Sequence, residues 1–162
     1  YGAGAPTLSR TFKKNGFDIS QTESAAMLQR LDEEFSMAAK WRSRVISLAN
    51  TQHWIRNPFG LRRYWYGSVG PAAANFIPQS TAAIISWTVL PELEKVLKGL
   101  GYVVNIIHDE FWIECRESDT SNVVDLSRNI LERTWPEVGE GFNVPVKIKK
   151  GKNWGEMEEL NV

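Results

Sequence analysis

Apolar residues recur at helical spacing through the first third of the chain. They predict a short helix over residues 7–14 and a longer one over residues 21–48, which Asp18 or Ser20 can cap and which breaks into two near Ser36. Most apolar positions of the longer segment are expected to lie in the core, and these are Ala25, Met27, Leu28, Leu31, Phe35, Ala38, Ala39, Val45 and Ile46.

The middle of the chain combines β-rich runs, turn residues and a long uncharged segment. Residues 54–56 and 63–66 flank Asn57-Pro58-Phe59-Gly60, which has the composition of a turn, so a hairpin is predicted here. Residues 71–99 predict a long helix that carries no charge before Glu92. Such a helix is expected to be buried against protein or against a ligand.

The last third of the chain begins with two apolar strands, residues 102–107 and 111–115, which meet at a tight turn. An amphipathic helix over residues 122–135 and a strand of alternating residues over 144–150 are predicted to follow. The order of elements is helices, hairpin, long helix, hairpin, helix and strand. It predicts an α+β fold with an antiparallel sheet.

Composition sets wide bounds on this picture. The 162 residues are enough for one domain with a core, and 43% hydrophobic with 23% charged residues is ordinary. We find no apolar run of about 18 residues and no signal-peptide pattern. The first residue is not Met, so we expect a piece of a longer protein or a processed product. The single cysteine, Cys115, suits a reducing compartment and is expected to be structural.

Charge is balanced overall, with 19 basic and 19 acidic residues, but its distribution is uneven. Between Phe35 and Pro91 there is no Asp or Glu, whereas the stretch from Glu92 onward is acidic. This basic block is either a surface that faces a polyanion or a solvated helix face with a hairpin. Its members are Lys40, Arg42, Arg44, Arg56, Arg62 and Arg63.

Three consecutive ionisable residues, His108-Asp109-Glu110, separate the two apolar strands of the last third. If they were buried, their charges would have to be neutralised or matched, which is expensive. A functional role would explain why the chain bears this free-energy cost, whereas in a plain solvent-exposed hairpin turn the cost would not arise. The pattern alone leaves both readings open.

In its strand–turn–strand context, His108-Asp109-Glu110 resembles motif C of the family A DNA polymerases, the bacterial polymerase I and phage replicase type. Four other segments are similar to further motifs of that family, in the same order and with similar spacing, so the resemblance covers essentially the whole chain. They are Tyr1-Gly2, which resembles the end of the fingers O helix; Phe59-Gly60-Leu61-Arg62-Arg63-Tyr64; Asn75-Phe76-Ile77-Pro78-Gln79-Ser80-Thr81-Ala82-Ala83; and Val144-Pro145-Val146 through Gly151-Lys152-Asn153-Trp154.

The resemblance implies a C-terminal fingers-and-palm segment of a right-hand polymerase fold. Residues 1–50 would be the end of the fingers, and residues 51–162 the palm with its hairpin, long helix, motif C and terminal strand. The implied activity is DNA-directed DNA polymerase, a template-dependent nucleotidyl transfer that uses two divalent ions, usually Mg²⁺. The implied partners are primer–template DNA and dNTP.

The resemblance also implies roles for single residues. Asp109 would be a metal ligand and catalytic, Glu110 an auxiliary catalytic carboxylate, and His108 would touch the primer terminus. The nucleic-acid-binding residues would further include Asn75 and Gln79, which lie one helical turn apart and can donate to minor-groove acceptors. They would also include Arg62 and Arg63, and Arg63 matches the arginine that contacts the primer backbone. Tyr1 and Gly2 would line the nucleotide and template pocket.

The sequence departs from the family in two places: Pro71 replaces a frequent arginine, and Pro78 lies one residue late, which would distort the helix near Gln79. The thumb, motif A with the other metal aspartate, and the O helix would lie upstream. We therefore expect activity only with an N-terminal part, which is either a covalent continuation of this chain or a separate chain. The expected location is the cytoplasm of a bacterial or phage-infected cell, and no membrane partner is expected.

The rival interpretation is a non-catalytic nucleic-acid-binding or interaction module that retains the palm fold. A carboxylate kept at Asp109, in an apolar context, argues against it. The sequence immediately upstream would discriminate between the two.

Overall fold

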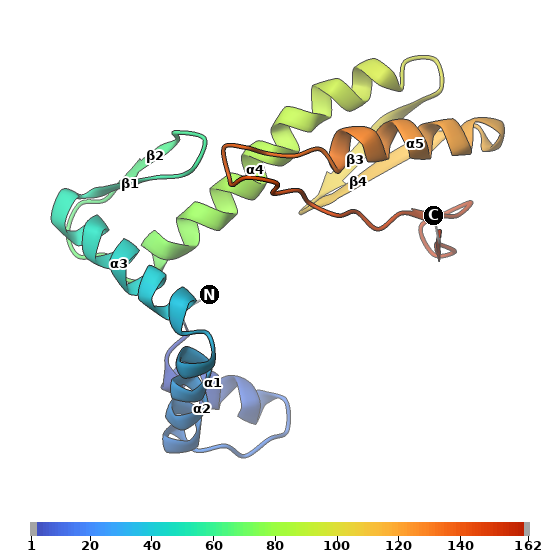
Figure 1. The fold of residues 1–162 in the computed structure, drawn as a ribbon. Helices are drawn as coiled ribbons and strands as arrows, with labels where there is room; N and C mark the ends of the chain where they lie inside the picture. The colour runs from blue at the N-terminus through green and yellow to red at the C-terminus, as the bar shows by residue number, and fades with distance from the viewer. Residues whose placement is uncertain (1–2, 161–162) are drawn as a thin grey trace. The chain divides into compact units, whose positions relative to one another are not determined.

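The computed structural model describes residues 3–160, and its first two helices follow the predicted pattern (Figure 1). Helix α1 spans Ala5–Lys14, two residues longer at its start than predicted because proline fits the first helical turn. Helix α2 spans Gln21–Glu34. Of the two candidate caps, Ser20 is the one used: its hydroxyl accepts from the Glu23 amide at 3.2 Å, and Glu23 accepts from the Ser20 amide at 2.9 Å. The Ser20 hydroxyl also donates to the Glu23 carboxylate at 2.7 Å, and this bond, together with the one from the Ser20 amide, lowers the pKa of the Glu23 carboxyl.

Helix α3 spans Ser36–Gln52, so the predicted break near Ser36 is confirmed. The predicted burial of the apolar positions is largely wrong. Only Val45 of that set is buried; Leu28, Ala39 and Ile46 are half-buried, and Ala25, Met27, Leu31, Phe35 and Ala38 are exposed. Helical spacing identifies an apolar face but not a partner for it, and within residues 3–160 this face of α2 and of the start of α3 has little cover.

The structure forms two compact units, residues 1–80 and 81–162, whose described parts we treat separately. In the first, strands β1 (Trp54–Arg56) and β2 (Arg62–Tyr64) form the predicted hairpin, which pairs Ile55 with Arg63. The core of this unit joins α3, the hairpin and the start of α4, and consists of Val45, Ala49, Ile55, Val69, Ala73, Ala74 and Phe76.

Two buried or half-buried asparagines fix the loops around this core. Asn50 donates to the Val69 carbonyl at 2.8 Å and accepts from the Val69 amide at 2.9 Å. Asn57 accepts from the Leu61 amide at 2.9 Å inside the hairpin loop and donates to the Ser80 hydroxyl on α4 at 3.0 Å. Because buried amides are costly to leave unpaired, these bonds position the hairpin against the helix.

Helix α4 spans Pro71–Val96 and is followed by a turn over residues 97–100, in which Gly99 adopts a φ of +87°. Pro78 was expected to distort the helix near Gln79, but α4 continues as a helix through Pro78 without interruption. In the second unit, Val89, Leu93 and Leu97 are almost completely buried.

The second unit continues with an antiparallel pair, β3 (Gly101–Ile107) and β4 (Glu110–Cys115), then a short 3-10 helix η1 (Glu117–Asp119) and helix α5 (Thr120–Leu131). The register shifts between Val103 and Asn105, which marks a β-bulge at the residue between them. The predicted end of α5 at residue 135 is wrong: Trp135 lies outside the helix and precedes Pro136, whose ring disfavours helical backbone in the residue before it.

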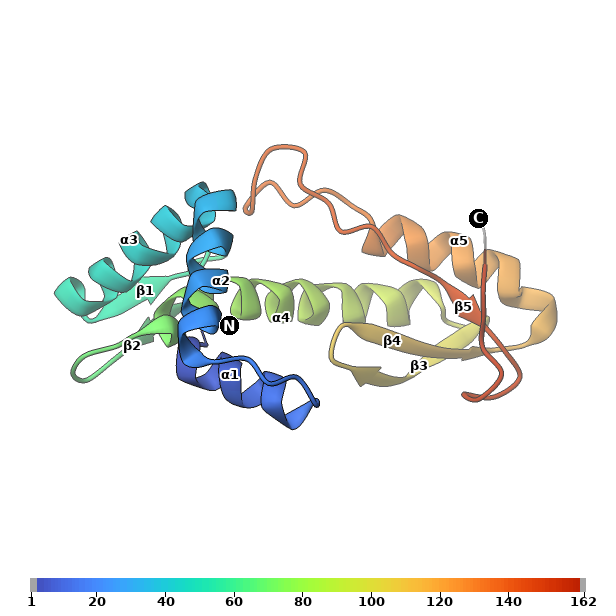
Figure 2. The same cartoon turned by 90° about the horizontal axis from the view of Figure 1, so that it is seen from below.

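The predicted strand over residues 144–150 is confirmed only at its end. Strand β5, labelled in Figure 2, is Lys149–Lys150. It pairs with β6, Glu158–Glu159. Pro145 has no amide hydrogen for a sheet ladder, which explains why the earlier part stays unpaired. The α+β class is confirmed, with three separate two-stranded antiparallel sheets in the described residues instead of one. No helix within residues 3–160 is both long and apolar enough for a membrane span.

Candidate active site

The turn between β3 and β4 consists of His108 and Asp109, because Ile107 pairs directly with Glu110. Glu110 is therefore the first residue of β4 instead of a turn residue. All three ionisable side chains are exposed. Because the three ionisable groups stay in contact with water, there is no free-energy cost of burying them, and burial does not indicate a function for this turn.

Another feature of the turn is the backbone of His108, whose φ of +57° lies in the left-handed region. A two-residue hairpin loop favours glycine, asparagine or aspartate where φ is positive, because a larger side chain is strained there. Strained residues that persist often belong to functional sites. Histidine is among the residues that adopt positive φ more readily than most, and at this position its imidazole lies next to a carboxylate on each of the following two residues.

His108→Gly is expected to leave the melting temperature unchanged or to raise it by a few degrees, since glycine relieves the strain at positive φ. His53→Gly is the matched control, because His53 adopts a φ of +61° at the end of α3. Thermal unfolding monitored by circular dichroism measures both. A clear loss of stability in His108→Gly alone would show that the imidazole holds the turn together.

The register of the hairpin assigns side chains to two faces. Glu110, Trp112 and Glu114 share one face of β4, and Phe111 and Ile113 share the other. Asp109 belongs to the loop, so the strand rule of opposite directions for neighbouring residues does not apply to the pair Asp109 and Glu110. Alternation along the strand therefore does not decide which of the two carboxylates faces an ion, and the choice of Asp109 rests on the family resemblance.

The C-terminal segment reaches the Glu110 face of this hairpin. Trp154 stacks on Trp112, with ring centroids 4.4 Å apart and an interplanar angle of 29°. Trp154 lies in the loop between β5 and β6, which we call the tail hairpin, residues 148–160. No pattern in the sequence pairs these two tryptophans, so sequence reasoning does not find the partner of Trp112.

Two arginines of the β1–β2 hairpin lie over aromatic rings. The Arg62 guanidinium lies 4.8 Å from the Trp54 ring centroid, and that of Arg63 lies 5.4 Å from Trp65 and 6.0 Å from Phe76. Both arginines remain exposed. A contact with an aromatic ring restricts where the guanidinium lies but does not occupy its N–H groups. These groups can therefore still donate hydrogen bonds to an anion. The alternation of arginines with aromatic residues in the sequence was the available signal for these supports.

The two amides of α4 differ in exposure. Asn75 is half-buried and Gln79 is exposed. Asn75 lines a groove of about 300 Å³ in the first unit, together with Leu31 of α2, Phe35 between the two helices and Trp41 of α3. The helix places the two amides one turn apart, as predicted.

The basic block is less uniform in space than in sequence. Arg42 donates through one nitrogen to both carboxylate oxygens of Asp32 at 2.8 Å, so its charge is matched. The remaining members, Lys40, Arg44, Arg56, Arg62 and Arg63, are exposed. The positive surface that could meet a polyanion thus consists of these five side chains of the first unit.

The structure divides the candidate residues between the two units. Arg62, Arg63, Asn75 and Gln79 belong to the first, and the His108-Asp109-Glu110 turn belongs to the second. Tyr1 and Gly2 lie outside the described residues. Within residues 3–160 no three His, Cys, Asp or Glu side chains form a metal-binding group. Asp109 in the turn and Glu110 at the start of β4 nevertheless offer two adjacent exposed carboxylates, which fit Mg²⁺, since this ion uses one or two protein carboxylates along with phosphates and water.

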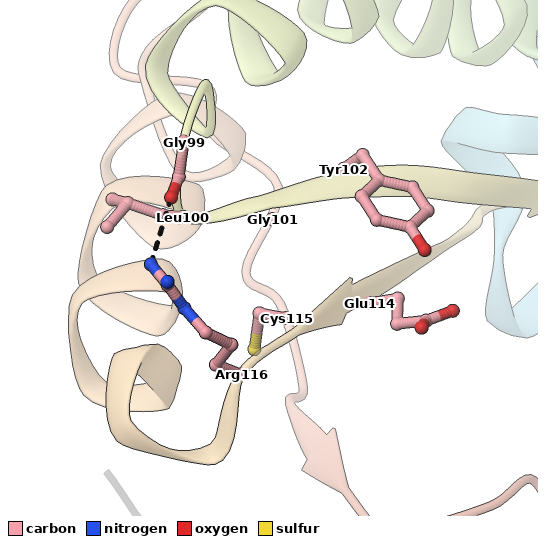
Figure 3. A pocket seen from close by; sticks show the side chains of 7 residues that line it. All are labelled: Gly99, Leu100, Gly101, Tyr102, Glu114, Cys115 and Arg116. Carbon is pink, nitrogen blue, oxygen red and sulfur yellow. Dashed lines mark hydrogen bonds between the residues drawn. The ribbon is translucent and has the colours of Figure 1, made fainter.

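A hollow of about 380 Å³ lies at the end of the β3–β4 hairpin away from the turn (Figure 3). Tyr102, Glu114 and Arg116 line it, and Arg116 donates to the Gly99 carbonyl at 3.1 Å. The Glu114 carboxylate raises the pKa of the Tyr102 phenol. Cys115 also lines the hollow, where it is half-buried, and its Sγ lies 4.0 Å from the Thr120 hydroxyl oxygen. None of the candidate catalytic or nucleic-acid-binding residues lines this hollow.

Comparison with known proteins places these features in a family. The model of a family described as DNA polymerase family A matches residues 1–156. No curated protein matches. One solved structure, the POL domain of Pol1 from M. smegmatis in complex with DNA primer-template and dNTP, has a TM-score of 0.71 and 23% sequence identity. The match covers 82% of this chain and 25% of that chain, so this chain spans about a quarter of the solved one. At this identity the likeness shows the fold.

Proposed function

The chain belongs to DNA polymerase family A, and we propose that it is the C-terminal fingers-and-palm segment of a DNA-directed DNA polymerase. In this proposal it performs template-dependent nucleotidyl transfer by a two-metal mechanism, together with an N-terminal part. The end of the fingers lies within residues 1–50 and the palm within residues 51–162.

The observation that carries the proposal is the position of Asp109. It lies at the tip of a hairpin whose strands pair up to Ile107 and Glu110, directly beside the turn. Its carboxylate is exposed, and thus free to meet an ion. A carboxylate at the end of a paired hairpin has less freedom than one in a long loop, and such restriction is what a catalytic ligand needs.

The chain's own groups supply defined parts of the chemistry. Asp109 would hold a metal ion and Glu110 would support that site from the first position of β4. Mg²⁺, when bound, lowers the pKa of the attacking 3′-hydroxyl and stabilises charge on the transferring phosphoryl. His108 would donate or accept a hydrogen bond at the primer terminus, from an exposed imidazole that the backbone holds beside Asp109.

Primer–template binding would come from the first unit. Arg62 and Arg63 donate to backbone phosphate, and their stacking on Trp54, Trp65 and Phe76 orders them beforehand. Asn75 and Gln79 on α4 donate to minor-groove acceptors, which every base pair presents, and this suits an enzyme that copies any sequence. Tyr1 and Gly2 complete the nucleotide and template pocket in the proposal.

The missing parts are also proposed from the family. An N-terminal part would bring the thumb, the O helix and the other metal aspartate, either in the same chain or as a separate one. Primer–template DNA and dNTP are the proposed partners and substrates, a proposal supported by the solved Pol1 structure, which is a complex with DNA primer-template and dNTP. The proposed location is the cytoplasm of a bacterial or phage-infected cell.

Primer extension by the assembled protein tests the proposal. The gene is expressed together with the sequence upstream of it, and incorporation of one matched dNTP onto a labelled primer is followed with Mg²⁺. Matched nucleotide should be incorporated in preference to the three mismatched ones. DNA binding without incorporation, combined with an upstream sequence that lacks a second metal aspartate, would favour the non-catalytic module instead.

Arg63→Ala in the assembled enzyme is expected to weaken DNA binding nearly equally for all sequences. The reason is that a phosphate contact contains no base information. The slope of log K against log salt should fall by about one. Binding titrations over a range of salt concentrations, with several unrelated primer–templates, measure both quantities.

Two variants control this experiment. Arg63→Lys keeps the charge but loses the planar stack over Trp65, so it should preserve the salt slope better than the alanine variant. Arg30→Ala removes an exposed arginine of α2, outside the hairpin, and should leave the slope unchanged. A loss of affinity for some sequences only would identify Arg63 as a base reader and contradict the assignment.

A further inference from the structure

We propose that Trp154 is a positioning residue for the Asp109 turn, and that the tail hairpin holds this turn in place through the Trp112–Trp154 stack. The inference rests on the proposed function for the role of the turn. Its structural part concerns contacts within the second unit alone.

The stack lies close to the candidate catalytic carboxylates along the chain. Trp112 is the third residue of β4, two residues after Glu110 and on the same face of the strand. A ring fixed on this face restricts the first residues of β4, and therefore the loop that ends at Asp109. The bulge beside Val103 faces this part of β4 across the pair, so the ladder alone is least regular here.

The Trp112 indole has few other restraints. Its Nε1 is buried, and within the part of the chain that the structure describes it has no hydrogen-bond partner. No hydrogen bond from those residues therefore sets the plane of the ring, which is fixed by packing. Trp154 supplies a stacked ring at 4.4 Å, an arrangement that gives aromatic pairs orientation as well as contact area.

Backbone pairing and a side-chain hydrogen bond order the loop of the tail hairpin that contains Trp154. Strands β5 and β6 pair Lys150 with Glu158, and the Leu160 amide donates to the Ile148 carbonyl at 2.9 Å. In the loop, the Asn153 side chain accepts from the Gly155 amide at 3.0 Å. These bonds close the loop around Trp154, so that its ring, 59% exposed, is held by an ordered hairpin instead of a free chain end.

Gly151 offers a way to disturb this loop without touching either ring. A Cβ added at Gly151 would lie 2.2 Å from the Glu156 carbonyl oxygen and 3.1 Å from the Met157 Cα. These are backbone atoms, so they cannot move aside as a side chain could. Gly151→Ala should therefore shift the tail hairpin and displace Trp154 from Trp112.

Hydrogen exchange in the assembled protein tests the structural part. In Trp154→Ala and in Gly151→Ala, amides of β3 and β4 beside the turn are expected to exchange about tenfold faster or more, whereas those of α3 and β1 keep their rates. Trp154→Phe retains a stacking ring and should restore slow exchange. Trp87→Ala removes another tryptophan of the second unit, 79% exposed, and should change nothing. Unchanged exchange in Trp154→Ala would overturn the proposal.

Single-turnover incorporation in the same preparations tests the consequence. Trp154→Ala should lower the rate about 10- to 100-fold and raise the Mg²⁺ concentration needed for half-maximal rate, because groups that orient a metal ligand act on this scale. The primer–template Kd should stay within about twofold, and Trp154→Phe should recover most of the rate. Loss of DNA binding in parallel with the rate would indicate general destabilisation and overturn positioning.

The two measurements separate two failures. If the unmodified assembly incorporates no nucleotide, the proposed function fails, and exchange alone decides whether the tail holds the turn. If the unmodified assembly is active and Trp154→Ala loosens the turn without slowing incorporation or changing its Mg²⁺ dependence, the proposed function survives and the positioning role is overturned.

Discussion

Asp109→Asn in the assembled polymerase is expected to lower single-turnover incorporation about a thousandfold or more. Replacing one carboxylate oxygen by an amide nitrogen removes the negative charge that a hard cation needs, and an essential metal ligand contributes on the order of several kcal/mol to transition-state stabilisation. Primer–template binding should survive, because Arg63, Asn75 and Gln79 are unchanged. Rapid-quench incorporation with saturating DNA and Mg²⁺ measures the rate.

Glu110→Gln is the paired variant, with an expected loss of about 10- to 100-fold, as for a group that supports a metal site without binding the metal directly. Asp125→Asn changes an exposed carboxylate of α5 and should have no effect. Near-normal incorporation by Asp109→Asn, or a larger loss from Glu110→Gln than from Asp109→Asn, would reverse the two assignments.

Purified residues 1–162, without any other polymerase part, are expected to extend no primer. In the family the two ions are shared with an aspartate of motif A, and no match to that motif is found in these residues. Within residues 3–160 no three metal-binding side chains lie together, so the turn has no second anchor among these residues. Gel-based primer extension with long incubation and high protein concentration checks this.

The positive control is the same chain assembled with its N-terminal part, and chelation of divalent ions supplies the blank. Circular dichroism must show that the purified chain is folded, so that inactivity is not due to unfolding. Templated incorporation by the chain alone, above the chelated blank and sensitive to Asp109→Asn, would contradict the proposal that catalysis needs an N-terminal part.

Local signals in the sequence were sufficient for many elements of the fold. Ser20 and Glu23 specify a helix start by themselves, since the two residues cap each other. The turn composition of Asn57–Gly60 specified the first hairpin, and the two apolar runs around His108 specified the second. In each case the deciding interactions lie within a few residues along the chain.

Elements that depend on distant parts of the chain were harder to predict. Alternation over residues 144–150 indicates a strand, but a strand needs a neighbour to pair with, and the described residues supply one only at Lys149–Lys150. Pro145 in that run and Pro136 after Trp135 were the local warnings, because proline removes a sheet donor and restricts the residue before it.

The candidate site was predictable to the same extent. The residue types at 108–110 and the arginines of the first hairpin could be singled out from sequence, because their chemistry is unusual for their surroundings. Their supports could not. The stacking of Trp154 on Trp112 joins residues 42 positions apart, and no periodicity in the sequence connects them. Whether the singled-out residues act as proposed stays a prediction.

The β-bulge in β3 affects how relatives of this chain should be aligned. Val104 is an extra residue, so counting by twos from Tyr102 assigns Ile106 to the wrong face, and the register instead groups Tyr102 with Asn105 and Ile107. A homologue that lacks this one residue would have a regular ladder with the counterparts of Tyr102, Asn105 and Ile107 still on one face. A single-residue gap at Val104 therefore removes the bulge without reversing the strand, whereas an alignment that places the gap elsewhere in β3 would assign some side chains to the wrong face.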